Sequence, residues 1–284
     1  MKIGISAEST IDMPKELLEK YDIHIVPFMV NVGEQTYKDG EIENEQLFKF
    51  FNETKKLPTT SAVNSEQYKE HFYNMLSNYD VVLHLAFSSK VSCAYENANR
   101  ASNEMTELGG EKRVFVVDTL LLSSGIGLLA IKSKEQITQG KSIEELVQFC
   151  ESEKSKVKVS LIVDKLNYIV KGGRCSALAC FGANLLSIKP LISVEDGKTK
   201  VGKKFIGSLE NCAKKYVDEI VKKTPNIDKK YVFLSYTQIE QKTKDELTKK
   251  LQDYGFENIM YAKASATIAC HTGPFALGVI FMEE

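Results

Sequence analysis

The first half of the chain alternates short apolar runs with segments whose apolar residues recur at helical spacing. Tyr68, Phe72 and Met75 stand at positions i, i+4 and i+7, which is the apolar stripe of an amphipathic helix. The segments that we predict to be strands are residues 2–6, 24–32, 81–87 and 113–117, and residues 2–6 alternate toward a buried strand. Strands that alternate with helices predict a parallel sheet covered by helices on both faces.

The pattern changes near Lys154. Residues 156–163 alternate polar with apolar side chains, which indicates a half-exposed strand of a mixed or antiparallel sheet. Amphipathic helices are expected at residues 208–222 and 243–254. The further strands that we predict are residues 191–194, 198–205, 231–236, 258–263 and 276–282, and residues 264–275 are expected to be a plain connection before the last of them.

We therefore predict an α/β protein of two domains. The N-terminal α/β domain, residues 1–154, carries a parallel sheet flanked by helices. The C-terminal α+β domain, residues 155–284, carries a mixed or antiparallel sheet. Ligand sites favour the cleft between domains and the carboxyl ends of parallel strands, so we expect the ligand in the cleft between these two.

Composition and charge narrow the class of protein. The chain has 284 residues, 43% of them hydrophobic, and a formal net charge of -1, which argues against binding nucleic acid or membrane surfaces through bulk charge. The longest apolar stretch, residues 120–131, is shorter than the roughly 20 residues that span a bilayer. Without an export signal or a C-x-x-C pair, the six cysteines are expected to be reduced thiols in the cytoplasm. The four histidines show no metal-binding spacing.

A glycine pair followed by a cation marks the middle of the C-terminal domain. Gly172 and Gly173 free the backbone, Arg174 follows at once, and residues 176–186 are predicted to be a helical run of small residues. A cation, a glycine turn and a helix start together can hold an anion. The alternative is a glycine pair that ends a helix beside a surface arginine.

Hydroxyl side chains gather in three predicted loops, at residues 59–61, at residues 88–92 and at Ser123 and Ser124. The second group follows a buried strand, where doubly wound sheets place their ligands. Hydroxyls in loops cap helices, bind anions or act as nucleophiles, and capping is the commonest role. Asp12 is a plausible N-cap for the helix that begins near Pro14.

His271 lies on a predicted Gly273–Pro274 turn before the last strand. A serine with a histidine suggests a hydrolase, but the chain has no G-x-S-x-G elbow, no phosphate-binding P-loop and no dinucleotide fingerprint. The hydroxyls, Arg174 and His271 therefore fit the capture of a carboxylate better than bond cleavage.

Over essentially its whole length the chain resembles the DegV family of bacterial fatty-acid-binding proteins. The motifs that carry the resemblance are residues 9–14 (Ser-Thr-Ile-Asp-Met-Pro), Thr60-Ser61, residues 88–92 after a strand, Asp118-Thr119 with residues 124–127, Leu166-Asn167-Tyr168, Lys171-Gly172-Gly173-Arg174, and His271-Thr272-Gly273-Pro274. The Lys-Gly-Gly-Arg and His-x-Gly-Pro motifs, in this order and spacing, are together specific for the family. The resemblance implies a fatty acid in a tunnel between an N-terminal α/β and a C-terminal α+β domain.

The resemblance also implies roles for single residues. Thr60, Ser61, Ser92, Arg174 and His271 match residues that hold the carboxylate of the acid. Well-studied members of the family offer the bound acid to a separate fatty acid kinase, and Lys203 and Lys204 stand where basic residues, usually arginine, help dock that kinase. No cofactor is implied besides the bound fatty acid.

The chain departs from the family pattern near the expected pocket. Glu8 replaces the aspartate that is usual in the family, and Ala62-Val63 replace Gln-Pro. Cys93-Ala94 replace Gly-Thr, and Phe275 replaces a glycine. Phe275 is expected either to narrow the pocket or to start the final strand and pack in the core.

We interpret the chain as a cytoplasmic fatty-acid-binding protein without chemistry of its own. Two alternatives stay open: a Ser/His hydrolase of acyl esters, and a regulatory protein that senses fatty acid. Delivery to a kinase and sensing produce the same sequence pattern.

Overall fold

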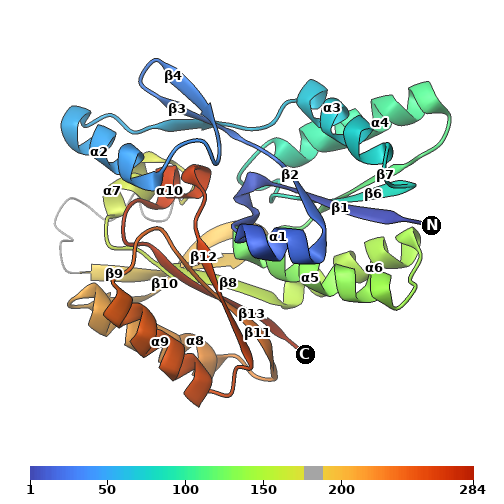
Figure 1. Ribbon diagram of the computed structural model, residues 1–284. Helices are drawn as coiled ribbons and strands as arrows, with labels where there is room; N and C mark the ends of the chain where they lie inside the picture. Colours follow the sequence, from blue (N-terminus) through green and yellow to red (C-terminus); the bar gives the residue numbers. More distant parts are fainter. Residues whose placement is uncertain (176–187) are drawn as a thin grey trace.

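A parallel sheet forms the centre of the N-terminal part, as predicted. The computed structural model describes residues 1–175 and 188–284. Four strands lie in the order β2-β1-β6-β7, and all three neighbouring pairs are parallel (Figure 1). The bounds of these strands are Ile3–Glu8 (β1), Ile23–Val26 (β2), Val81–Ala86 (β6) and Val114–Asp118 (β7).

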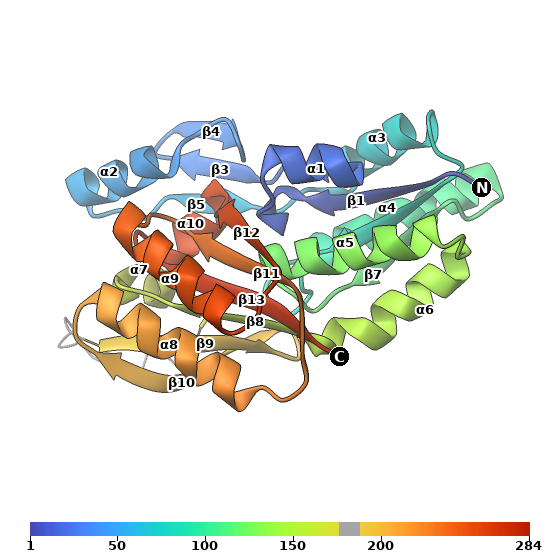
Figure 2. The ribbon, with the colours of Figure 1, turned by 60° about the horizontal axis from the view of Figure 1, so that its bottom comes forward.

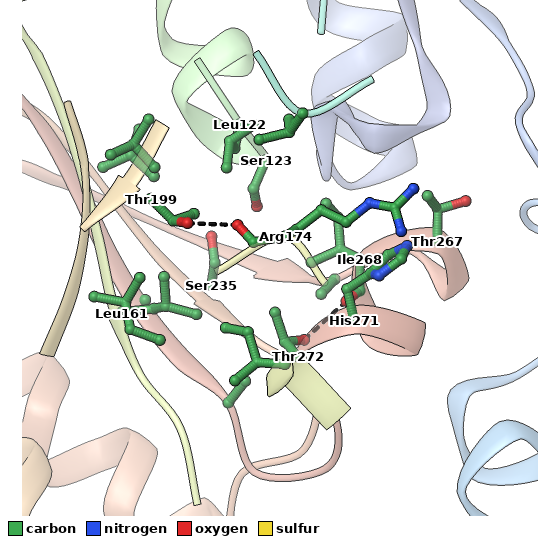
Figure 3. A pocket seen from close by; sticks show the side chains of 18 of the residues that line it. Leu122, Ser123, Leu161, Arg174, Thr199, Ser235, Thr267, Ile268, His271 and Thr272 are labelled. Atoms are coloured by element: carbon green, nitrogen blue, oxygen red, sulfur yellow. Dashed lines mark hydrogen bonds between the residues drawn. The ribbon is translucent and has the colours of Figure 1, made fainter. Parts of the chain in front are cut away.

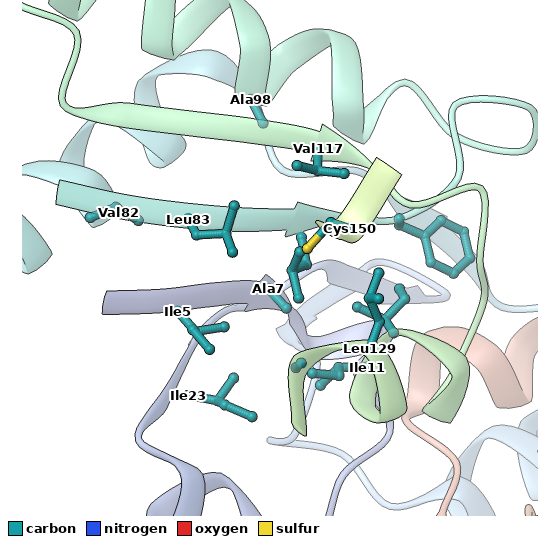
Figure 4. Close-up of a cluster of buried hydrophobic side chains, with 14 of the residues drawn as sticks. Ile5, Ala7, Ile11, Ile23, Val82, Leu83, Ala98, Val117, Leu129 and Cys150 are labelled. Carbon is teal, nitrogen blue, oxygen red and sulfur yellow. The ribbon is translucent and has the colours of Figure 1, made fainter. Parts of the chain in front are cut away.

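Helices cover both faces of this sheet. One face is covered by α3 (Ser65–Leu76) and α4 (Ala94–Gly109), and the other by α5 (Ser124–Thr138) and α6 (Ile143–Glu153), with α1 (Lys15–Tyr21) beside β2. Ile5 and Leu83 are fully buried between the two layers, where Ala98 of α4 and Leu129 of α5 approach the strands from opposite sides (Figure 4). Burial on both faces is why β6 is an almost continuous apolar run in the sequence.

The C-terminal part is built on a mixed sheet of six strands in the order β10-β9-β8-β13-β11-β12. All pairs are antiparallel except β11 with β12. The strand bounds are Val157–Ile162 (β8), Ile188–Glu195 (β9), Lys198–Ile206 (β10), Ile227–Tyr236 (β11), Asn258–Lys263 (β12) and Leu277–Glu283 (β13). Helices α8 (Leu209–Lys223) and α9 (Gln241–Asp253) cover one face of this sheet, and the predicted fold class is confirmed.

Helix α5 is shared by the two sheets. It contacts β1 and β6 on one side and β8, β11 and β13 on the other (Figure 2). Residues Ser124 to Ile131 are all buried, as expected for a helix enclosed on every side. A Cβ on Gly125 would lie 2.4 Å from Val159 Cγ2, so this glycine lets the helix approach β8 closely. The two parts therefore pack through α5, and a domain boundary near residue 154 stays a prediction.

A small third sheet was not predicted. Residues 24–32 form two strands in different sheets, because Pro27 has no N–H to continue the ladder and the next amide, that of Phe28, donates to Ser9 Oγ at 3.1 Å. The sheet has the order β4-β3-β5. Its strands are Met29–Val32 (β3), Gln35–Lys38 (β4) and Thr59–Ser61 (β5), and β5 replaces a segment that we expected to be a loop.

The connection expected at residues 264–275 contains a helix, α10 (Ala266–Thr272). It packs against β3, β5, α2 (Asn44–Thr54) and α7 (Leu166–Lys171). Two 3-10 turns, η1 (Ser9–Ile11) and η2 (Lys154–Lys156), complete the described elements. The helical run predicted at residues 176–186 lies outside the described residues. Within those that are described, no helix has both the length and the apolar character needed to cross a membrane.

Candidate functional site

A cavity of about 270 Å³ lies between the carboxyl-end loops of the parallel sheet and the mixed sheet. Both parts of the chain line it, mostly with apolar side chains (Figure 3). The apolar residues that line it include Phe28, Ala62, Phe87, Val91 and Leu122 from the N-terminal part, and Val159, Leu161, Ile192, Val194, Ile268, Leu277 and Ile280 from the C-terminal part. Such a cavity suits a ligand with a long apolar portion.

Thr60 and His271 meet in the cavity wall. Thr60 Oγ1 lies 3.0 Å from His271 Nε2, which is hydrogen-bond distance. Strand β5 holds Thr60 through its pairing with β3, and α10 packs on both of these strands. The adjacent Ser61 is exposed and lies outside the cavity wall, where its Oγ accepts from Asn31 Nδ2 at 3.2 Å. Successive side chains of a strand point to opposite faces, so only one of the two lines the cavity.

His271 lies in the last turn of α10 and not on the predicted glycine-proline turn. That turn begins at Gly273, whose φ of 74° ends the helix. Burial and the nearby Arg174 guanidinium lower the pKa of His271 to about 4, so the imidazole is neutral at pH 7. Its Nδ1 atom is buried without a hydrogen-bond partner among the described residues. A Cβ on Gly172 would lie 2.8 Å from this atom, so only glycine fits there.

Arg174 follows the C-terminus of α7 and lines the cavity next to His271 (Figure 3). Gly172 is the C-cap of α7, as the alternative interpretation of the glycine pair required, yet Arg174 is not only a surface residue. Its Nη1 donates to Gly172 O at 2.8 Å, and its own carbonyl accepts from Thr199 Oγ1 at 2.5 Å. Strand β10 thus fixes the backbone that carries the guanidinium.

Ser92 lines the cavity in the turn after β6, as predicted from its place beyond a buried strand. Its Oγ accepts from Ala94 N at 3.2 Å, which leaves its O–H proton for another acceptor. Ser88 in the same turn donates to Gly197 O at 2.8 Å and so connects this turn to the β9-β10 hairpin. Four of the five predicted ligand residues therefore line one cavity, and their binding role stays a prediction.

Two buried carboxylates that the sequence did not reveal hold the first turn of α10. Asp39 accepts from Ala266 N at 2.9 Å and Thr267 N at 3.3 Å. Asp12 accepts from Ser265 N at 2.8 Å, and Ser123 Oγ donates to it at 2.5 Å. Burial raises the pKa of Asp12 to about 7. The expectation that Asp12 caps the following helix was wrong: Pro14 stands at that N-cap, and Asp12 turns away with a φ of 48°.

Two of the residues at which the chain departs from the family pattern, Glu8 and Phe275, lie in very different surroundings. Glu8 is fully buried and accepts from Tyr68 Oη at 2.6 Å and from Phe87 N at 3.0 Å. It therefore holds the start of the turn that carries Ser92. Phe275 takes neither expected role: its side chain is 37% exposed and lies outside the cavity wall, and its φ is 57°. That left-handed backbone explains why a glycine suits this position.

The signals that would have found the missing site residues are weak. Ser123, Ser235, Thr199 and Thr267 also line the cavity. Only Ser123 belongs to a hydroxyl cluster that we singled out, and the other three lie in segments that we expected to be strands or a plain connection. Within the described residues, the structure shows no cluster of three or more side chains arranged to hold a metal ion.

Comparison with known proteins identifies relatives over the whole chain. The model of the DegV family of uncharacterised proteins matches residues 2–284. A fatty acid-binding protein of Thermotoga maritima is 32% identical, over 98% of this chain and 96% of its own. The structure of a fatty-acid-binding DegV family protein from Thermus thermophilus superposes with a TM-score of 0.87 at 27% identity, over 100% of both chains. The Fak B3 protein of Streptococcus pneumoniae, loaded with linoleic acid, shares the fold at 19% identity, with a TM-score of 0.86 over 100% of both chains.

Proposed function

The chain belongs to the DegV family, and from this premise we propose that it binds a long-chain fatty acid in the cavity between its two sheets. The carboxylate of the acid lies against Thr60, Ser92, Arg174 and His271, and the acyl chain extends along the apolar wall. The observation that carries the proposal is the meeting of Thr60 and His271, beside Arg174, in the wall of a largely apolar cavity.

The chemistry of the wall suits both ends of such a ligand. Each CH₂ group that leaves water for an apolar cavity contributes about 0.8 kcal/mol. A carboxylate in the same cavity must be hydrogen-bonded or paired, because an unpaired buried charge is costly. Hydroxyl donors at Thr60 and Ser92 and the permanent charge of Arg174 supply both kinds of contact.

The surroundings of His271 favour binding over acyl hydrolysis. A catalytic histidine needs a second group, usually a carboxylate, that orients the ring and stabilises its charged form. Among the described residues, no group forms a hydrogen bond with Nδ1 of His271. The charged group that acts on the imidazole is the positive guanidinium of Arg174 and not a carboxylate. That cation disfavours a protonated imidazole, so we propose that the protein is a ligand carrier and not an enzyme.

We propose further that the protein, in the cytoplasm, presents its acid to a fatty acid kinase through the outer face of β10 and α8. Lys203 of β10 is half exposed and pairs with Glu219 of α8 at 2.5 Å. Lys203, Phe205, Lys215, Lys222 and Lys223 line a shallow groove on this face together with Asp218 and Glu219. Lys204 is exposed on the same strand but does not line this groove. The charge reversal Lys203→Glu should therefore abolish phosphorylation of the bound acid by the kinase, with a smaller effect of Lys204→Glu, while acid binding is retained. Unchanged phosphorylation would support a sensing role instead.

The ligand itself is tested by mass spectrometry. Native and denaturing spectra of protein purified from cells should show one fatty acid per chain. A nucleotide or a sugar at the same stoichiometry would overturn the proposal. Thr60→Val protein, purified in parallel, should carry less of the acid.

A further inference from the structure

Helix α10 presents two threonines to the cavity, and their hydroxyls are in different situations. Thr272 Oγ1 donates to Ile268 O, four residues earlier, at 2.9 Å. Thr267 has no such carbonyl in its helix, because α10 begins at Ala266 and the residue four positions earlier, Lys263, belongs to β12. Thr267 is only 4% exposed, and its Oγ1 has no hydrogen-bond partner among the described residues.

An unpaired hydroxyl at this depth disfavours the ligand-free protein. A buried polar group without a partner loses its bonds to water and gains nothing in return. Among the cavity-lining residues that the structure describes, only Thr267 and His271 have a buried polar side-chain atom without a partner. The Nδ1 atom of His271 is packed against Gly172, whereas the Thr267 side chain belongs to the cavity wall.

Thr267 lies at the polar end of the cavity. It precedes His271 by four residues, so both side chains project from the same face of α10. Thr267, Arg174 and His271 all line the cavity, and in the view of Figure 3 they appear toward the same end of it. Asp39 accepts the backbone amide of Thr267 at 3.3 Å, which holds the threonine in place at the start of the helix.

We propose that the Thr267 hydroxyl donates a hydrogen bond to the carboxylate of the bound acid. This inference rests on the proposed function and adds a specificity-determining residue to the head-group site. A hydroxyl that donates to a carboxylate makes a charge-assisted bond, which is stronger than a bond to a neutral oxygen. Thr267 therefore favours a carboxylic acid over the alcohol of the same chain length.

The test compares valine replacements of the two threonines, because valine keeps the shape of threonine without its hydroxyl. Delipidated wild-type, Thr267→Val and Thr272→Val proteins are titrated with oleate by calorimetry, and with oleyl alcohol as the neutral probe. Thr267→Val should weaken oleate binding about tenfold, or about 1.4 kcal/mol, and affect the alcohol less. It should also raise the melting temperature of the ligand-free protein. Thr272→Val should bind oleate within about threefold of wild type, and its melting temperature should not rise.

The outcomes distinguish a failure of the role of Thr267 from a failure of the proposed fatty acid binding. A wild-type protein that does not bind oleate overturns the proposed function. A wild-type protein that binds oleate, with Thr267→Val binding equally well, overturns the role of Thr267 alone. Equal losses of oleate affinity in Thr267→Val and Thr272→Val also overturn the role of Thr267, because they would show that any hydroxyl in the cavity wall has the same effect. Thr267→Ser, which keeps the hydroxyl, should bind oleate like wild type, and Thr267→Ala replaces the valine variant if that one does not fold.

Discussion

Thr60 Oγ1 and His271 Nε2 lie 3.0 Å apart although 211 positions separate the two residues in the chain. Thr60 belongs to the edge strand β5 of the small sheet, and His271 to the last turn of α10. The contact orients the imidazole and brings the N-terminal part of the chain to the C-terminal part at one end of the cavity. The two residues are therefore expected to act on the ligand as a unit.

A double-mutant cycle on this pair should show that unit. Thr60→Val and His271→Gln should each weaken fatty acid binding by about 0.5–3 kcal/mol, the range for losing one hydrogen bond to a charged or buried group. Together they should weaken it by less than the sum, because each change already breaks the shared contact. Calorimetry with delipidated protein measures all three. Ser61→Ala, next in sequence but outside the cavity wall, is the matched control and should bind like wild type.

Neighbouring glycines should respond differently to alanine. Gly172→Ala places a Cβ 2.8 Å from His271 Nδ1 and 2.9 Å from Tyr168 O, so the ring must shift from its position beside Thr60 and acid affinity should fall. Gly173 has a φ of 72° and open space around its Cβ position. Gly173→Ala should therefore cost about 1 kcal/mol of stability through the left-handed backbone and leave affinity unchanged. Equal affinities for the two variants would contradict the contact between Gly172 and His271.

Asp12 should make the protein less stable as the pH rises. Its pKa is raised by burial from 3.8 to about 7, so the folded protein keeps the proton that the unfolded chain releases above about pH 4. The stabilising contribution is complete below pH 4 and is lost as the pH rises through 7, by up to about 1.4 kcal/mol per pH unit. Asp12→Asn lacks this titration. Urea unfolding at pH 5, 6, 7 and 8 should show the wild type losing stability relative to Asp12→Asn as the pH rises. If the free energies of unfolding of the two proteins change in parallel with pH, Asp12 does not have the raised pKa.

Phe275→Gly should leave both stability and ligand profile nearly unchanged. Truncating a core phenylalanine costs about 3–5 kcal/mol, but this side chain is more than one third exposed. Relief of the left-handed backbone, about 1–2 kcal/mol, offsets the added flexibility of glycine and the lost apolar contact. We expect a net change of about 1 kcal/mol or less in thermal melts. A large destabilisation, or a shift in the acyl chains bound, would show that Phe275 packs inside the protein.

The sequence by itself determined the two main sheets and four of the polar residues that line the cavity, Thr60, Ser92, Arg174 and His271. Strand β6 is recognisable because a parallel strand buried on both faces needs a nearly continuous apolar run, which only His84 interrupts here. Residues 156–163 are recognisable as β8 because one face of that strand is less buried and the side chains alternate. Arg174 follows a glycine pair, and Ser92 follows the end of a buried strand. Both features are local signals for a binding site.

Only the tertiary structure decided where α10 forms and which residues hold it. A helix of seven residues is too short to be stable alone, so its local sequence carries little signal. Asp12 and Asp39 bond to its first amides from 253 and 227 positions away. The orientation of His271 depends on this placement, as does the Thr267 hydroxyl, which has no hydrogen-bond partner among the residues that the structure describes. Contacts between residues so far apart leave no periodic trace in the sequence, because no local backbone pattern has to change to make them.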